Sequence, residues 1–158
     1  MTDSEFKAIF DEVYLRMPDY ALETISYYRE KFGVGMQIFL SDEPVDRAEL
    51  KDQMNYPSAI LHPDQTTWYF AFRPRIAEAS TDIIETIIRH EFVHAFIIAA
   101  EKTYLRKARI AIGDFEKLLK DSDPTYKSDT PSNKIERLTR FINKAWGSDE
   151  DKARQSGY

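Results

Sequence analysis

Apolar side chains recur with helical spacing through residues 4–31, and this periodicity predicts two amphipathic helices. The repeat is interrupted at Met17-Pro18-Asp19, because a proline disfavours helical backbone at the residue before it. The second helix is expected to end near Gly33 and Gly35, since glycine commonly follows the last residue of a helix. The apolar positions are Phe6, Ile9, Phe10, Val13 and Leu15 in the first helix, and Tyr20, Leu22, Ile25, Tyr28 and Phe32 in the second.

The period then shortens to that of strands. Residues 34–40 alternate in the manner of a strand, and residues 59–62 and 66–72 read as two more. Pro63-Asp64-Gln65 has turn chemistry, so the last two strands are expected to form a hairpin. Residues 41–56 are polar and are interpreted as a loop or a short helix. Together these segments predict a short, antiparallel, three-stranded sheet.

A long helix is predicted from Ile83 to about Lys102, where the chain has neither glycine nor proline. Ser80, Thr81 and Asp82 offer oxygens that can cap its first turn, and Asp82 with Glu85 has the spacing of a capping box. Its apolar residues cover most of the circumference, which is typical of a buried, central helix. They are Ile83, Ile84, Ile87, Ile88, Phe92, Val93, Phe96, Ile97 and Ile98.

Residues 104–120 are predicted to be helical with a break at Gly113, and residues 121–133 to be a loop. Ser132 or Asn133 can cap a last helix, which carries Ile135, Leu138, Phe141, Ile142 and Trp146. The remaining residues, 147–158, are expected to be a flexible C-terminal tail. The sequence therefore predicts an α+β fold in one domain over residues 1–146, with helices before and after the sheet.

Composition narrows the class of protein. The 158 residues are 42% hydrophobic and 31% charged, as in ordinary globular proteins. The absence of cysteine excludes disulfides and zinc sites made of thiolates. The acidic N-terminus lacks the features of a secretory signal, and charged residues interrupt the longest apolar stretch, so we expect a cytoplasmic protein without a membrane span. A net charge of −5 argues against nucleic acid as the main partner.

The segment His90-Glu91-Phe92-Val93-His94 lies on the long helix and carries the clearest chemistry. Two histidines four residues apart stand on one helical face, where both rings can bind a single ion. Zn²⁺ accepts imidazole nitrogen at about 2.0–2.1 Å, and a catalytic zinc keeps one position for water. Glu91 is rotated about 100° from His90. It can therefore accept a proton from that water and later protonate a leaving amine.

This pentapeptide resembles the His-Glu-x-x-His motif of the zincin metallopeptidases. The neighbouring residues Ile87, Ile88, Phe92, Val93, Ala95 and Phe96 are uncharged, as in the extended motif of that family. The resemblance implies a zinc-dependent hydrolase that cleaves peptide bonds, with His90 and His94 as metal ligands, Glu91 as the general base, and a peptide or protein as substrate.

Two other interpretations remain open at this point. The chain can be a metallopeptidase-like binding or regulatory module that lacks a complete site. Alternatively, His90 and His94 can be satisfied core groups of a purely structural protein, with Glu91 paired to Arg89 or another cation.

The third zinc ligand is not evident. No histidine follows His94, so the resemblance is closest to the thermolysin type, whose third ligand is a carboxylate. Asp114 and Glu116 lie at a chain distance like that of the ligand in that group, and we predict that one of them completes the site. Asp114 can equally cap a helix after Gly113, and Glu116 can be a surface residue.

Other positions are weaker candidates for the third ligand. Glu101 is two turns beyond His94, which is about 10 Å along a straight helix and too far to share an ion. His62 precedes the predicted hairpin turn and is an upstream alternative.

Zincin peptidases commonly hold substrate as an extra strand at a sheet edge, and the resemblance would implicate residues 66–72. The aromatic run Trp68-Tyr69-Phe70 has a simpler interpretation as alternating core and surface positions. Tyr104 and Arg106 follow the motif helix and are candidates for stabilising the oxyanion, but nothing in the sequence selects either one.

Overall fold

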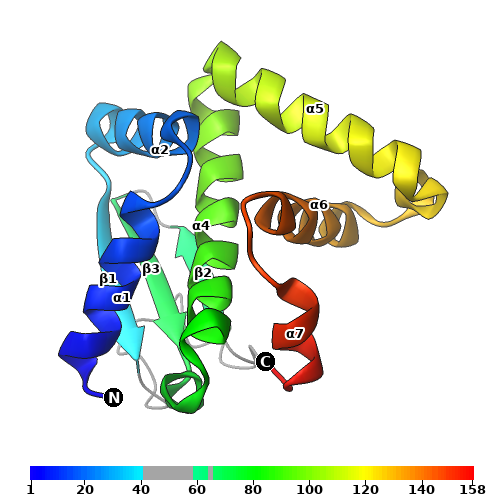
Figure 1. Cartoon of the computed structure of the whole chain (residues 1–158). Helices are drawn as coiled ribbons and strands as arrows, with labels where there is room; N and C mark the ends of the chain where they lie inside the picture. The colour runs from blue at the N-terminus through cyan, green and yellow to red at the C-terminus, as the bar shows by residue number, and fades with distance from the viewer. Residues whose placement is uncertain (41–58, 64–65) are drawn as a thin grey trace.

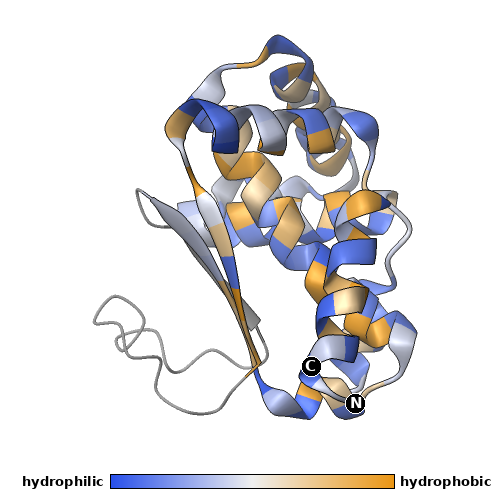
Figure 2. Cartoon of the chain, turned by 90° about the vertical axis from the view of Figure 1, so that its left-hand side faces the viewer, coloured by the Kyte–Doolittle hydropathy of each residue, from blue (hydrophilic) through white to orange (hydrophobic). Residues whose placement is uncertain are grey.

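The structure is a computed structural model that describes residues 1–40, 59–63 and 66–158. Its helices gather on one side of a small sheet (Figures 1 and 2). The helices are α1 (Asp3–Leu15), α2 (Asp19–Phe32), α4 (Thr81–Thr103), α5 (Arg106–Ser122), α6 (Pro131–Ala145) and α7 (Glu150–Gln155), and the short 3₁₀ helices are η1 (Pro74–Glu78) and η2 (Pro124–Ser128). The strands are β1 (Gly35–Leu40), β2 (Ala59–Pro63) and β3 (Thr67–Phe72).

The two N-terminal helices confirm the prediction from periodicity. Thr2 caps α1, since its hydroxyl oxygen accepts a hydrogen bond from the Glu5 amide at 3.1 Å. Helix α2 ends at Gly33, whose φ of 64° lies in the left-handed region that glycine adopts without strain. The chain then enters β1 directly.

The sheet differs from the predicted one. Its order is β1-β3-β2, with β3 in the centre. β2 and β3 form the expected antiparallel hairpin, but β1 pairs with β3 in parallel, from Gly35 opposite Thr67 to Leu40 opposite Phe72. The predicted α+β fold with an antiparallel three-stranded sheet is therefore wrong. The described chain is mainly helical. β2 runs opposite to β3, and β3 runs in the same direction as β1. The loop or short helix predicted over residues 41–56 lies outside the described residues, as do Asp64 and Gln65 of the predicted turn.

Helix α4 is the buried centre of the molecule, as its sequence predicts. It contacts α1, α2, β2, α5, α6 and α7. Phe92 is fully buried and packs on Phe10 and Phe70, with ring centroids 4.7 and 5.2 Å away. The motif residues therefore stand on a rigid element.

The predicted capping box at the start of α4 does not form. The Ser80 side chain makes no capping hydrogen bond. Glu85 instead accepts from Arg16 at 2.8 Å, and Asp82 pairs with Lys152 on α7. These ion pairs join the first turns of α4 to α1 and to the C-terminal helix.

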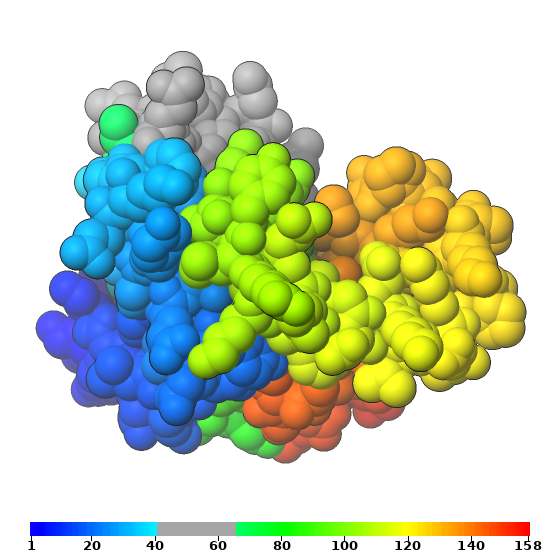
Figure 3. All heavy atoms as spheres, turned by 90° about the horizontal axis from the view of Figure 1, so that it is seen from above, coloured from blue at the N-terminus to red at the C-terminus, as the bar shows by residue number. Residues whose placement is uncertain are grey.

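Helix α5 leaves the core. It starts after Tyr104, which has a φ of 57°, and projects away from the end of α4 (Figures 1 and 3). The predicted break at Gly113 is wrong, because α5 continues without interruption from Arg106 to Ser122.

The C-terminal third is more ordered than predicted. The expected loop over residues 121–133 contains η2 and the first turn of α6, which is capped by Thr130 rather than by Ser132 or Asn133. The expected flexible tail contains α7, in which Glu150 and Ala153 are buried. The sequence misses α7 because six residues carry too little periodicity to mark a helix.

We predict that Gly113→Ala stabilises the protein by about 0.5–1 kcal/mol, because glycine inside a helix costs backbone entropy relative to alanine. A Cβ added at Gly113 meets no atom within 4 Å, so no clash offsets the gain. Urea denaturation followed by circular dichroism measures the change. A lower free energy of unfolding in the variant would contradict a continuous, exposed helix at this position.

Candidate metal centre

His90 and His94 project from one face of α4, with ring centroids 5.1 Å apart. Both Nε2 atoms face one carboxylate, that of Glu136 on α6. The His90 Nε2 lies 2.9 Å from one oxygen of Glu136, and the His94 Nε2 lies 3.2 Å from the other. One ligand atom from each of the three residues can be chosen so that all lie within 4.8 Å of one another. This is the one such group of three or more metal-ligating side chains found in the described part of the chain.

The group fits a zinc ion. Two ligand atoms bound about 2.1 Å from a tetrahedral zinc are about 3.4 Å apart. The two nitrogen–oxygen separations, 2.9 and 3.2 Å, are close to that value. Two imidazoles and a carboxylate are three protein ligands, which leaves the fourth position of a catalytic site open. The Glu136 side chain is 41% exposed, so that position can be reached from solvent.

The packing of α6 brings Glu136 to the histidines. Leu138 and Ile142 are buried in a cluster with Val93 of α4. Asp129, before the helix, accepts hydrogen bonds from the Thr130 amide and from Arg137, which fixes the first turns. Glu136 lies beside this buried face rather than on the outer one. The position of the Glu136 carboxylate therefore depends on how α6 packs against α4, and not on the residues next to Glu136 in the chain.

Charge is concentrated at this point. Burial lowers the pKa of His90, but hydrogen bonds to Glu136 and Glu150 and the charge of Glu91 outweigh it and raise the pKa to about 10. Burial raises the pKa of Glu136, but hydrogen bonds from His90 and His94 outweigh it and hold the pKa well below its ordinary value. The cluster therefore favours positive charge between its carboxylates.

A second carboxylate approaches His90 from the other side of the ring. The Nδ1 atom lies 2.6 Å from an oxygen of Glu150, which is the first residue of α7. Glu150 is only 5% exposed. Both ring nitrogens of His90 are thus engaged by acidic side chains from two different helices.

Glu91 follows His90 in the chain and is only 6% exposed. Its negative charge is close enough to raise the pKa of His90. Its placement beside the group, and not within it, agrees with the helical rotation expected between positions 90 and 91.

Asp114 and Glu116, the predicted third ligands, are not in the group. Glu116 accepts a hydrogen bond from the Tyr126 hydroxyl at 2.8 Å and pairs with Lys120 at 3.3 Å. Asp114 is exposed on α5. Because α5 turns away from α4 after Tyr104, it carries both carboxylates away from His94, and the carboxylate comes instead from α6, which packs back against α4 (Figure 1).

The weaker candidates also lie outside the group. Glu101, Tyr104 and Arg106 are exposed near the junction of α4 and α5. His62 is in β2, opposite Tyr69 of β3.

β3, the strand that the resemblance implicated in substrate binding, has no open edge. β3 is the central strand and pairs with β1 on one edge and with β2 on the other, so its backbone cannot accept another strand. The side chains from Trp68 to Phe72 are all buried, so this run belongs to the core, and the expected alternation of core and surface positions is wrong.

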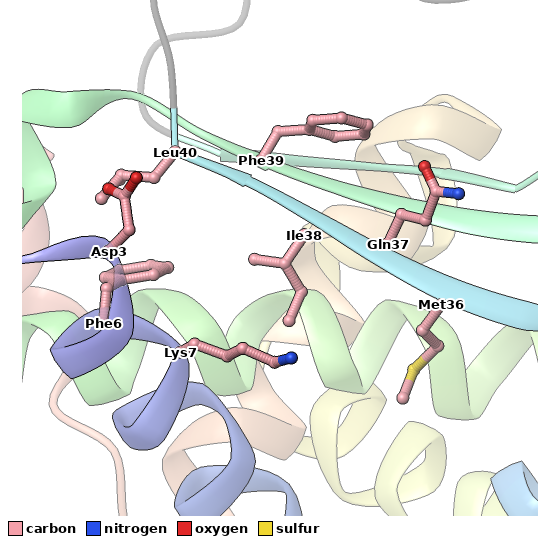
Figure 4. A pocket seen from close by; sticks show the side chains of 8 residues that line it. All are labelled: Asp3, Phe6, Lys7, Met36, Gln37, Ile38, Phe39 and Leu40. Carbon is pink, nitrogen blue, oxygen red and sulfur yellow. The ribbon is translucent and has the colours of Figure 1, made fainter.

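A separate cavity of about 450 Å³ lies between α1 and β1 (Figure 4). Phe6 and Lys7 line it from α1, and Met36 and Ile38 from β1. None of its lining residues belongs to the histidine–carboxylate group, so it is not part of the candidate metal centre.

Sequence reasoning missed Glu136 and Glu150. Glu136 is rotated about 100° from Ile135 and lies away from the predicted apolar stripe, so its position in the chain carried no signal. Only a pairing of that helix with α4 would have placed it near the histidines. Glu150 lies in the segment predicted to be a tail, where a single acidic residue carries no such signal.

We predict that Glu136→Gln lowers zinc affinity at least about 10-fold, because it removes a charged ligand. Glu116→Gln is the matched control, since it alters a half-buried glutamate on the neighbouring helix. Competition with a chromophoric chelator measures both. Equal losses in the two variants, or a loss only in Glu116→Gln, would reject Glu136 as the ligand.

The stability of chelator-treated protein should depend on pH. The pKa of His90 is raised from 6.5, so its contribution is fully present below pH 6.5 and is lost as the pH rises towards 10. The pKa of Glu136 is lowered from 4.5, so its contribution is present above pH 4.5 and is lost at lower pH. We expect the greatest stability between about pH 4.5 and 6.5.

Urea denaturation across this range tests the expectation. The decline from pH 6.5 to 9 should be smaller in Glu136→Gln, because one partner of His90 is then neutral. A free energy of unfolding that rises between pH 6.5 and 9 would contradict the assigned charges.

In the described chain, no helix combines the length and the apolar character needed to cross a bilayer. Comparisons with families of known proteins, with curated proteins and with solved structures found no match. The inference of function therefore depends on the geometry of the histidine–carboxylate group and on the motif that carries it.

Proposed function

We propose that this protein is a zinc-dependent hydrolase that cleaves peptide bonds. The observation that carries the proposal is the convergence of His90 and His94 of α4 on Glu136 of α6, with Glu91 buried next to His90. Two imidazoles and one carboxylate form the ligand set of thermolysin-type zinc peptidases.

Zinc held by these residues would polarise a substrate carbonyl group and lower the pKa of a water molecule towards about 7. Glu91 has the role of proton carrier. Its carboxylate accepts a proton as the water oxygen bonds to the carbonyl carbon. It then gives the proton to the nitrogen as the carbon–nitrogen bond breaks. The products are a carboxylic acid and an amine, so atoms and charge balance.

The surroundings of Glu91 favour this role. A buried carboxylate is shielded from bulk water, and its electrostatic interactions are stronger there than in solvent. It is fixed to the same rigid helix as both imidazole ligands, so its distance from them does not depend on a loop.

We assign substrate binding to β2 in place of β3. β2 contacts α4, and within the described sheet it pairs with β3 on one edge and with no strand on the other. A peptide that adds to this edge gains main-chain hydrogen bonds close to the motif helix.

The alternative of an incomplete, non-catalytic module was motivated by the lack of an evident third ligand. The closeness of Glu136 to both imidazoles supports a complete ligand set and therefore weighs against that alternative.

We predict that Glu91→Gln lowers peptide turnover by about 10²- to 10⁴-fold, the usual contribution of a general base, while zinc binding persists. Glu101→Gln is the control, since Glu101 is exposed on the same helix. Mass spectrometry of a peptide library measures turnover, and elemental analysis measures zinc. A Glu91→Gln variant with the parent rate would rule out this mechanism. Parent protein that binds zinc but cleaves no member of the library would favour the non-catalytic module.

A further inference from the structure

A chain of buried polar contacts connects His90 to three helices. The Asn143 side-chain amide of α6 donates to the Thr86 carbonyl oxygen of α4 at 3.1 Å and to Glu150 of α7 at 2.7 Å. The same oxygen of Glu150 lies 2.6 Å from the His90 Nδ1. Asn143 is fully buried, and Glu150 nearly so.

The chemistry of these groups fixes their orientations. An ionised carboxylate only accepts hydrogen bonds, so the His90 Nδ1 must be the donor. The His90 ring is then held with its Nε2 towards Glu136, where that atom is available to a metal. Asn143 uses its amide hydrogens for two acceptors, so its orientation is fixed as well.

This orientation of Asn143 leaves one of its polar atoms without a hydrogen bond. Its side-chain oxygen is buried and has no hydrogen-bond partner within the described chain. An unsatisfied buried acceptor is unfavourable, and a simple packing role would be served better by an apolar side chain of similar size. The amide is therefore explained by what its nitrogen does, which is to hold Glu150 in place.

Helix α7 is attached to α4 by further contacts. Asp149 caps α7, as its side chain accepts from the Lys152 amide at 3.0 Å. Lys152 pairs with Asp82 on α4, and Ala153 is buried in the main core. These contacts place Glu150 against His90 and also provide variants that disturb α7 without touching the histidine.

We propose that Glu150 is a positioning residue of the metal centre, and that α7 is thereby part of the site. Glu150 acts on the metal through His90, since it fixes the ring and makes the imidazole a stronger ligand. Asn143 supports it from α6. This inference rests on the proposed zinc function, but it concerns residues outside the motif and outside the ligand set.

Zinc affinity is the first test, measured by competition with a chelator in the full chain. We expect Glu150→Ala to weaken binding about 100-fold and Glu150→Gln about 10-fold, because the loss of an outer carboxylate costs 10- to 100-fold in affinity. Glu150→Gln keeps the shape of the side chain, so it serves where the alanine variant does not fold. Lys152→Ala is the control and should bind zinc within about twofold of the parent.

The His90 ring provides a second readout that does not depend on activity. In the zinc-loaded parent, nuclear magnetic resonance should show a His90 Nδ1 proton that exchanges slowly with water and resonates far downfield. Glu150→Ala should lose both properties, since no carboxylate accepts the proton. Lys152→Ala should keep them.

Three results would overturn the inference. Parent affinity in both Glu150 variants would show that the residue does not act on the metal. Equal weakening by Glu150→Gln and Lys152→Ala would show that α7 contributes only general stability. A parent protein that binds no zinc would contradict both the proposed function and this inference. This outcome differs from a failure of the inference alone, in which the parent binds zinc and the Glu150 variants bind it equally well.

Discussion

The bridge of Glu136 between two imidazoles is the interaction on which this structure depends. It joins α6 to α4, which are far apart in sequence, at a point where two histidines and a carboxylate meet. The apolar contacts of Leu138 and Ile142 with α4 determine how α6 sits. A rotation of α6 by one residue, about 100°, would turn Glu136 away from the rings. The packing of α6 against α4 therefore also determines where Glu136 lies relative to the two imidazoles.

The charges around His90 would favour a bound cation at this point. Three carboxylates, from Glu91, Glu136 and Glu150, surround His90, and buried negative charges are costly unless they are paired. A proton on His90 offsets part of this negative charge, and the carboxylates therefore raise the pKa of His90. A divalent cation supplies another and competes with those protons for the ring nitrogens. The same carboxylates therefore favour metal binding and strengthen the ligands.

The sequence predicted the features that depend on residues close together in the chain. The apolar circumference of α4 indicated a buried helix, and the spacing of His90 and His94 placed both rings on one face. The direction of β1 relative to β3 was not accessible, because it depends on the path of the chain between them. The same limit applies to Glu136 and Glu150. Their neighbours in sequence resemble those of surface glutamates, and only the return of α6 and α7 to α4 distinguishes them from Glu116.

A crystal structure of the zinc-loaded protein, with anomalous data collected on both sides of the zinc absorption edge, would locate the ion. We expect one anomalous peak within about 2.2 Å of the Nε2 atoms of His90 and His94 and of a carboxylate oxygen of Glu136. A peak bound by a different carboxylate, or two imidazoles with no peak between them in zinc-saturated crystals, would contradict this expectation.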